Sequence, residues 1–231
     1  MQRSAPHRTR LLACAAAAAV PVMLIAGCSS TKTTTSDSPS GPASGSAPAS
    51  ASPSLAAARY AALPEPCKAI TTKTVKALVP KAKDASGVAA KSTDPAARGG
   101  CSWNGLDGFQ YRWLDVALQR FDSVAGIGSA ESQAVKRYEE LVAEAKAVKG
   151  ATATETAGLG DEATTVTAKV TKDKEQYEDV TVIVRTGNVT VILTYNGAGF
   201  ETAKTPKAAD IQKDALTAAK EAVASVAAKN A

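Results

Sequence analysis

Three runs in the second half of the chain alternate valine or leucine with polar residues, and this periodicity most tightly constrains the fold. The runs cover residues 166–170, 180–184 and 189–195. Because successive side chains of a strand point to opposite faces of its sheet, each run predicts a strand with one buried face and one wetter face. Gly187-Asn188 joins the last two runs. This dipeptide is a favoured two-residue hairpin turn, so the two strands are predicted to pair antiparallel.

The rest of the second half and the middle of the chain add more strands and several helices. Two strands are predicted over 101–104 and 109–121, joined by a short glycine-flanked connection. Helices are predicted over residues 55–62, 71–78, 129–148 and 206–226. Residues 81–100 are polar and contain turn signals, which predicts a loop. The predicted fold class is therefore α+β, with a mostly antiparallel sheet of about five strands and helices packed on one face.

Residues 1–27 have the organisation of a lipoprotein signal peptide. Arg3, Arg8 and Arg10 precede an apolar run from Leu11 to Ala26. This run is shorter than the roughly 20 residues of a membrane-spanning helix and suits a secretory signal. It ends in Leu-Ile-Ala-Gly-Cys at residues 24–28, which resembles the bacterial lipobox. The resemblance implies that Cys28 receives a diacylglyceryl group, becomes the new N-terminus and anchors the protein to the cell membrane. An ordinary signal peptide with a chance cysteine is the alternative.

The segment that follows the lipobox is a predicted tether. Between Cys28 and residue 54 the chain consists mainly of Ser, Thr, Pro and Ala and has no large apolar residue. Such a segment cannot bury enough apolar surface to offset the entropy of ordering, so it is predicted to be disordered. The sequence thus divides into a signal peptide over 1–27, a lipidated cysteine with its tether over 28–54, and one globular domain over 55–231.

Removal of the signal peptide changes the chemistry that is available to the protein. It takes away three arginines and the single histidine, His7. The mature chain is then nearly neutral, without the basic field that nucleic-acid binding needs. Without histidine, Ser-His-Asp and Cys-His catalytic systems and imidazole metal sites are excluded. We therefore predict no catalytic residue, no metal and no cofactor; a histidine-free hydrolase that uses carboxylates is the alternative.

Cys67 and Cys101 are the two cysteines that remain besides Cys28 in the mature chain. An even pair in an oxidising compartment predicts one disulfide. Two free or metal-binding thiols are the alternative.

Aromatic residues cluster between positions 103 and 121. On an extended strand, Phe109, Tyr111 and Trp113 share one face, which continues through Asp115, Ala117 and Gln119 to Phe121. The opposite face carries Leu114, Val116 and Leu118 and is the predicted core side. The row Phe109, Tyr111, Trp113 and Phe121 is then a candidate ligand-binding surface, because rigid aromatic side chains can stack on sugar rings or receive a partner's side chains. The alternative is that a helix covers the row and makes it core.

Several short motifs together resemble an uncharacterised domain that is common in actinobacterial secreted lipoproteins. That family shows a lipobox, a Ser/Thr/Pro spacer, a Pro-Cys that opens a helix, a Cys-x-Trp strand, a Gly-Leu-Gly-Asp turn and an Arg-x-Gly-Asn hairpin. Here the motifs are Pro66-Cys67, Cys101-Ser102-Trp103, Gly158-Leu159-Gly160-Asp161 and Arg185-Thr186-Gly187-Asn188. The resemblance covers roughly residues 60–230 and implies an outer-face lipoprotein domain with paired cysteines, without an established activity or ligand.

These features lead to an expectation for function. We expect a lipoprotein on the outer face of the cytoplasmic membrane, held by lipidated Cys28, whose domain is a ligand-binding or sensing module of the cell envelope. A cell-wall glycan, a lipid or an envelope protein is the expected partner, and nucleic acid is not. The alternative is a non-catalytic structural or assembly partner of a membrane or cell-wall protein complex.

Overall fold

A computed structural model describes residues 55–231 of the chain. The predicted signal peptide over 1–27, the lipidation site Cys28 and the predicted tether to residue 54 lie outside the described residues. No helix within 55–231 combines the length and the apolar character that crossing a bilayer requires.

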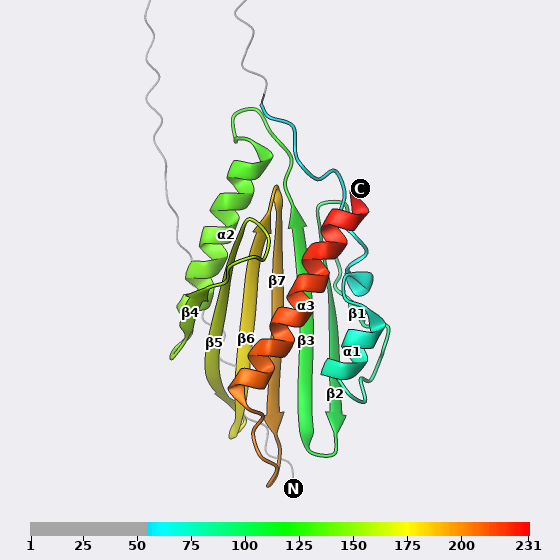
Figure 1. The fold of residues 1–231 in the computed structure, drawn as a ribbon, viewed down its shortest axis with the longest axis vertical. Coiled ribbons are helices and arrows are strands. Elements are labelled where there is room, and N and C mark those ends of the chain that lie inside the picture. The colour runs from blue at the N-terminus through cyan, green and yellow to red at the C-terminus, as the bar shows by residue number, and fades with distance from the viewer. Residues whose placement is uncertain (1–54) are drawn as a thin grey trace, which may run out of the picture. The chain divides into compact units, whose positions relative to one another are not determined.

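The described residues form one antiparallel sheet of seven strands in the order β1-β2-β3-β7-β6-β5-β4 (Figure 1). The strands are β1 (Val88–Ala89), β2 (Arg98–Asp107), β3 (Gln110–Arg120), β4 (Thr152–Glu155), β5 (Glu162–Lys172), β6 (Glu175–Thr186) and β7 (Val189–Gly199). The α+β class and the antiparallel pairing are confirmed, but the sheet has seven strands rather than about five. The two additional strands are β1 and β4, which are short and lie at the two edges of the sheet.

Three α-helices and one 3₁₀ turn accompany the sheet: η1 (Pro66–Lys68), α1 (Thr72–Leu78), α2 (Ala130–Lys146) and α3 (Ala208–Lys229). The side chain of Thr71 caps α1 by accepting a hydrogen bond from the backbone N–H of Thr74, and Ser129 caps α2 in the same way. α3 begins two residues after Pro206, and Lys207, which makes no side-chain cap, precedes it.

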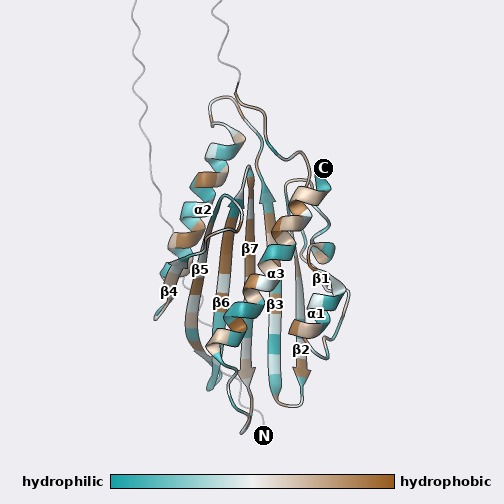
Figure 2. Cartoon of the chain, in the orientation of Figure 1, coloured by the Kyte–Doolittle hydropathy of each residue, from teal (hydrophilic) through white to brown (hydrophobic). Residues whose placement is uncertain are grey.

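α1 and α3 cover one face of the sheet, here called the core face. Leu114 and Val116 of β3, Val182 of β6 and Leu193 of β7 are fully buried there. α3 contributes small side chains to the same core, at Ala215, Ala218, Ala219 and Ala222. These alanines allow α3 to lie close along the sheet, which it crosses diagonally (Figure 1). Hydrophobic and hydrophilic stretches alternate along both the strands and the helices (Figure 2).

α2 packs on the opposite face, so the prediction of helices on one face only is wrong. The Tyr138 hydroxyl of α2 lies 2.7 Å from the Thr164 hydroxyl of β5, and Thr164 pairs with Ile183 of β6. Ile183 points away from the core face because its neighbours Val182 and Val184 point into it. The apolar stripe of α2 thus covers Ile183 and its surroundings. The sequence pattern showed this stripe but not the face on which it packs.

The first described residues form an extended strap rather than the predicted helix over 55–62. The backbone N–H and C=O of Tyr60 bond to the buried side-chain amide of Asn188, and the N–H groups of Ala61 and Ala62 bond to the side chain of Asn230. Because these polar groups of the strap are satisfied by side chains far along the chain, local helix formation is not needed to satisfy them.

Cys67 and Cys101 form a disulfide that links η1 to β2, as the cysteine pair predicts. Cys101 is buried beside Trp103 in the core, and Cys67 packs against it. The link therefore fastens the beginning of the domain to the sheet.

Candidate functional site

The strand register places the aromatic row on the face opposite the core. Leu114, Val116 and Leu118 are buried on the core face. Tyr111, Trp113, Asp115, Ala117 and Gln119 alternate with them and therefore occupy the second face of the sheet, together with α2. α2 contacts mainly β6 and β7, and to a smaller extent β5. Trp113 on β3 is 41% exposed.

The part of the second face that α2 leaves largely uncovered is here called the open face. It consists of three rows of side chains that run across β2, β3, β7 and β6. The rows are Leu106, Tyr111, Ala198 and Tyr177; Asn104, Trp113, Asn196 and Asp179; and Ser102, Asp115, Thr194 and Thr181. From the spacing within and between strands, these rows span an area of about 13 Å by 14 Å.

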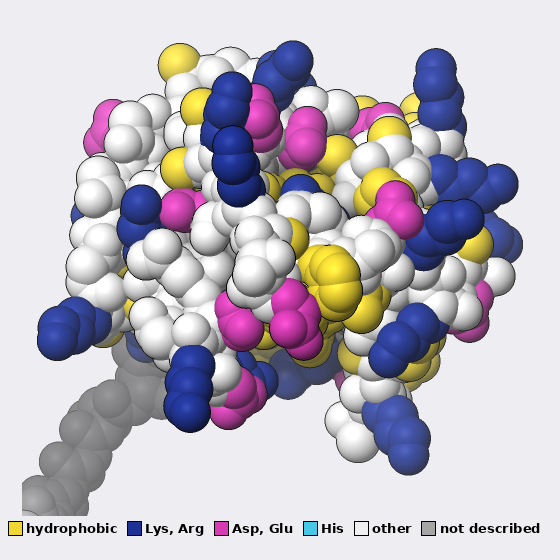
Figure 3. Space-filling model, turned by 90° about the horizontal axis from the view of Figure 1, so that it is seen from below, with side chains coloured by type: hydrophobic (Ala, Val, Ile, Leu, Met, Phe, Trp, Pro, Cys, Tyr) yellow, Lys and Arg dark blue, Asp and Glu magenta, His cyan; other side chains and the backbone are white. Residues whose placement is uncertain are grey.

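One end of the open face is aromatic. The rings of Tyr111 and Phe200 stack with their centroids 5.6 Å apart, and the ring of Tyr177 meets them edge-on at 6.0 and 6.3 Å. Phe109, in the turn between β2 and β3, is 55% exposed beside this cluster. Hydrophobic side chains gather at this end of the molecule, with Asp and Glu side chains beside them (Figure 3).

The structure does not bring the whole predicted row together. Phe109, Tyr111 and Trp113 lie near one end of β3, whereas Phe121 follows its other end, roughly 40 Å along an extended chain. Tyr177 and Phe200 were missed. Their place in the cluster depends on the pairing of β6 with β7 and of β7 with β3. This strand order cannot be predicted from the spacing of residues along the chain.

The second and third rows are polar and incompletely satisfied. Burial raises the pKa of the Asp115 carboxyl. Burial also raises the pKa of the Asp179 carboxyl, and a hydrogen bond from Asn196 partly opposes this effect. The Asn196 side-chain oxygen is buried without a hydrogen-bond partner among the described residues. Buried carboxyls and a buried amide oxygen without a hydrogen-bond partner destabilise a fold. Their presence here therefore indicates a surface used for binding rather than for stability.

A cavity of about 500 Å³ adjoins the open face at Asp115. Residues of three strands line it: Gly100, Ala117 and Ile192. Thr190, which is fully buried, also lines the cavity, and its hydroxyl has no partner among the described residues. Lys91 and Arg98 also line this cavity. The cavity therefore extends the polar rows into a recess.

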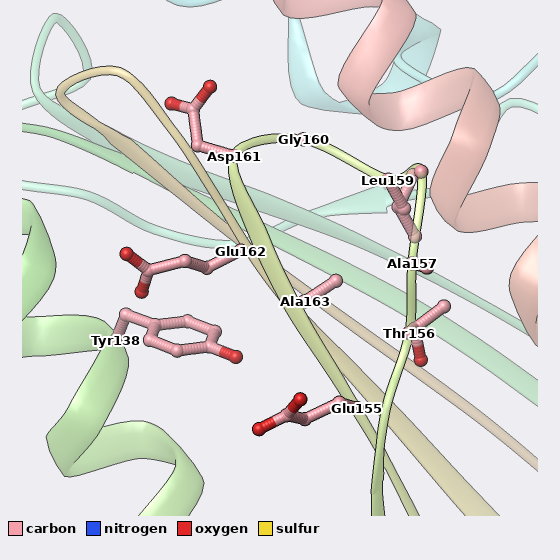
Figure 4. A pocket seen from close by; sticks show the side chains of 10 residues that line it. Tyr138, Glu155, Thr156, Ala157, Leu159, Gly160, Asp161, Glu162 and Ala163 are labelled. Carbon is pink, nitrogen blue, oxygen red and sulfur yellow. The ribbon is translucent and has the colours of Figure 1, made fainter.

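A second cavity, of about 600 Å³, lies at the Gly158–Asp161 turn (Figure 4). Its acidic residues are engaged in the fold. The Asp161 carboxylate accepts a hydrogen bond from the backbone N–H of Gly187 and pairs with Arg59 and Arg185, and Glu162 also pairs with Arg185. In Figure 4, Tyr138 and Glu162 lie on one side of β5 and α3 lies on the other.

The glycines of this turn are explained by its geometry. Gly160 has φ +64°, and a Cβ there would lie 2.5 Å from the backbone oxygen of Arg185. Leu159 is buried in the core. The motif is therefore a structural turn that ties β5 to the β6–β7 hairpin.

Asn188 is likewise structural. It is fully buried, and its side-chain NH₂ donates to the backbone oxygens of Tyr60 and Phe121. Its position fits a glycosylation sequon, but a buried amide with both hydrogens engaged cannot be a glycan acceptor in the folded domain. Asn188 instead fixes the strap to the sheet.

Comparison with known proteins places the chain in a family. The family model described as "Protein of unknown function (DUF3558)" matches residues 23–206. The chain belongs to this family. The match confirms the resemblance to a family of proteins of unknown function and ends before α3. Within it, the Gly-Leu-Gly-Asp turn, the Arg-x-Gly-Asn hairpin and the Cys-x-Trp strand all have structural roles in this chain.

Two other comparisons add little. No curated protein matches the chain. The crystal structure of LpqN, described as involved in cell envelope biogenesis of Mycobacterium tuberculosis, is 13% identical and aligns with 58% of this chain and 82% of its own at a TM-score of 0.32. A likeness this distant supports no argument about fold or function.

Proposed function

We propose that this member of the family is a lipoprotein, anchored through Cys28 to the outer face of the cytoplasmic membrane, that binds a ligand of the cell envelope through its open face. The observation that carries the proposal is the juxtaposition of half-exposed Trp113 with the half-buried carboxyl of Asp115 and the buried side-chain oxygen of Asn196, which is unpartnered within residues 55–231. Folding alone gives no reason to place these groups together on an uncovered surface.

The way the strap is attached supports this function. Tyr60 is fixed at the β6–β7 hairpin, next to the end of β3. The aromatic end of the open face lies at the other end of β3, which has 11 residues. The chain therefore enters the domain about 35 Å from the aromatic cluster. If Cys28 is lipidated, the tether joins the domain at the end remote from this cluster, which leaves the cluster free to meet envelope material.

We further propose that the domain binds its ligand without chemical conversion. Asp115 and Asp179 are the two carboxyls of the open face, but they are separated by the intervening strand β7 and by one row. Their Cα atoms are thus about 12 Å apart. Glycoside hydrolases hold two carboxyl groups about 5–9.5 Å apart on either side of one bond. From their Cα positions, the two side chains here would have to extend toward each other, whereas the Asp179 carboxyl accepts a hydrogen bond from Asn196. This separation favours a binding surface over a catalytic pair.

A structural or assembly role remains the second candidate. Val88, Leu106 and Phe109 are exposed hydrophobic residues near the β1–β2 side of the sheet. Exposed apolar side chains of this kind could anchor a protein partner.

Retention by envelope material tests the proposal. The Cys28→Ala protein, which has no lipid anchor, should still co-sediment with a washed envelope fraction, and Trp113→Ala in the same background should lose this retention. Ile127→Ala is the matched control, because Ile127 is 69% exposed in the loop before α2, away from the open face. Equal retention of the Trp113→Ala and Ile127→Ala proteins would refute the open face as the binding surface.

A further inference from the structure

We infer that the ligand of the open face is an uncharged glycan chain, whose rings stack on Trp113 while its hydroxyl groups donate to the acceptors around it. This inference rests on the proposed function and specifies its ligand. It follows from the charge, the hydrogen-bonding character and the shape of the open face, taken in turn.

The charge of the three rows disfavours anionic partners. The rows contain two carboxyls, Asp115 and Asp179, and no lysine or arginine. Within residues 55–231 neither carboxyl takes part in an ion pair. Over these rows, anionic lipid headgroups, phosphate-bearing polymers and uronic acids would meet the two acids, because Lys91 and Arg98 line the adjoining recess and not the rows. The rows therefore favour a neutral or cationic ligand.

The hydrogen-bonding groups of the open face are mainly acceptors. Ionised Asp115 and Asp179 can only accept, and the buried side-chain oxygen of Asn196 has no hydrogen-bond donor among the described residues. These groups surround the half-exposed ring of Trp113. A pyranose ring offers the matching surface, because its C–H face can stack on an aromatic ring and its hydroxyl groups project from the edge as donors.

The recess beside Asp115 extends this match. Thr190 is buried there with an unpartnered hydroxyl, which can donate to or accept from a sugar hydroxyl. A glycan that lies over Trp113 and Asp115 could place a substituent in the 500 Å³ cavity. Both parts of the surface then contribute to the same ligand.

The shape of the open face disfavours a basic peptide, which is the main competitor. β3 and β7 each pair with neighbours on both sides, so their backbone groups are used within the sheet. An extended peptide therefore cannot add a strand at this surface, as it does at an exposed sheet edge. A flat face of rings and acceptors is instead suited to the flat rings of a glycan.

Tryptophan fluorescence of the full chain provides the test. The chain has two tryptophans, of which Trp103 is buried and Trp113 is 41% exposed. Titration with neutral glucan, mannan and galactan oligosaccharides should shift the emission of Trp113 and protect it from acrylamide for at least one of these classes. Trp113→Ala should weaken binding of that oligosaccharide, measured by calorimetry, by at least about tenfold, which corresponds to about 1.4 kcal/mol. Ile127→Ala should bind as the wild type does.

Oligolysine, phosphatidylglycerol vesicles and envelope material serve as comparison probes. They distinguish failure of the glycan assignment from failure of the open face as a binding surface. If oligolysine or phosphatidylglycerol vesicles cause the Trp113-dependent change and no neutral oligosaccharide does, the glycan assignment is wrong while the open face remains a binding surface. Trp113-dependent retention on envelope material together with a flat response to all neutral oligosaccharides also overturns the glycan assignment alone. Oligosaccharide binding that is unaffected by Trp113→Ala would remove both the assignment and the proposed site.

Discussion

The buried amide of Asn188 gives the sharpest prediction about stability. Asn188→Ala removes the donors to the backbone oxygens of Tyr60 and Phe121, at 2.9 and 2.7 Å, and the acceptor for the N–H of Tyr60, at 2.8 Å. Each lost hydrogen bond in a buried site costs about 1 kcal/mol, because a backbone group is left without a partner. The variant is therefore expected to lose about 3 kcal/mol of unfolding free energy.

For a domain of this size, a loss of about 3 kcal/mol lowers Tm by roughly 6–12 °C. Thermal and urea unfolding of the two proteins, followed by circular dichroism, measure it. Asn104→Ala is the matched control, because Asn104 is only half-buried and its side chain makes no hydrogen bond among the described residues; its change should stay within about 0.5 kcal/mol. If Asn188→Ala unfolds at the same temperature as Asn104→Ala, the argument that Asn188 holds the strap to the sheet is wrong.

Three further changes test the anchor, the disulfide and the buried acid. In the Trp113→Ala background, which removes retention through the open face, Cys28→Ala is expected to release the folded protein from the membrane, and finding this double variant still in the membrane fraction would refute lipid anchoring. Replacing Cys67 and Cys101 by alanine opens a link between residues 34 apart, which costs about 2–4 kcal/mol in urea unfolding; native mass measurement that detects two free thiols would contradict the link. Burial raises the pKa of Asp115 in the folded state above 3.8, so the wild-type domain gains stability as pH falls through that raised value. Asp115→Asn should therefore be the more stable protein at neutral pH, with an advantage that shrinks toward pH 3.8, and an advantage that does not change with pH would show that the charge is not responsible.

The central strands could be predicted because their periodicity is local. Val182 on β6 and Val191 on β7 alternate with polar neighbours, and the Gly187-Asn188 turn between the strands fixes their pairing. The same rule separated Trp113 from Leu114 on β3. In both cases the residues that carry the signal lie within a few positions of each other along the chain.

The elements that were missed depend on distant partners. β1 and β4 are short edge strands with little buried apolar surface, so no periodic signal marks them. The strap around Tyr60 is extended because Asn188 and Asn230, far along the chain, bond to its backbone. α2 has an apolar stripe, but the sheet face that receives this stripe is decided by the tertiary arrangement.

The candidate site was only partly predictable for the same reason. The half of the open face that lies on β3, with Tyr111, Trp113 and Asp115, follows from alternation along one strand. The half on β6 and β7, with Tyr177 and Asn196, follows from strand order. The most distinctive motifs of the sequence, such as Gly158–Asp161, mark structural turns and gave no guide to the site.

Footprinting of the protein in its own envelope tests the central claim most directly. Hydroxyl radicals would be generated on intact envelopes and on the extracted protein, and oxidation of each peptide compared by mass spectrometry. Trp113 and Phe109 are expected to be oxidised less in the envelope than after extraction, while Ile127, which is 69% exposed, should react equally in both. Equal oxidation of Trp113 in the two states, with the domain folded in each, would contradict the claim that the open face carries an envelope ligand.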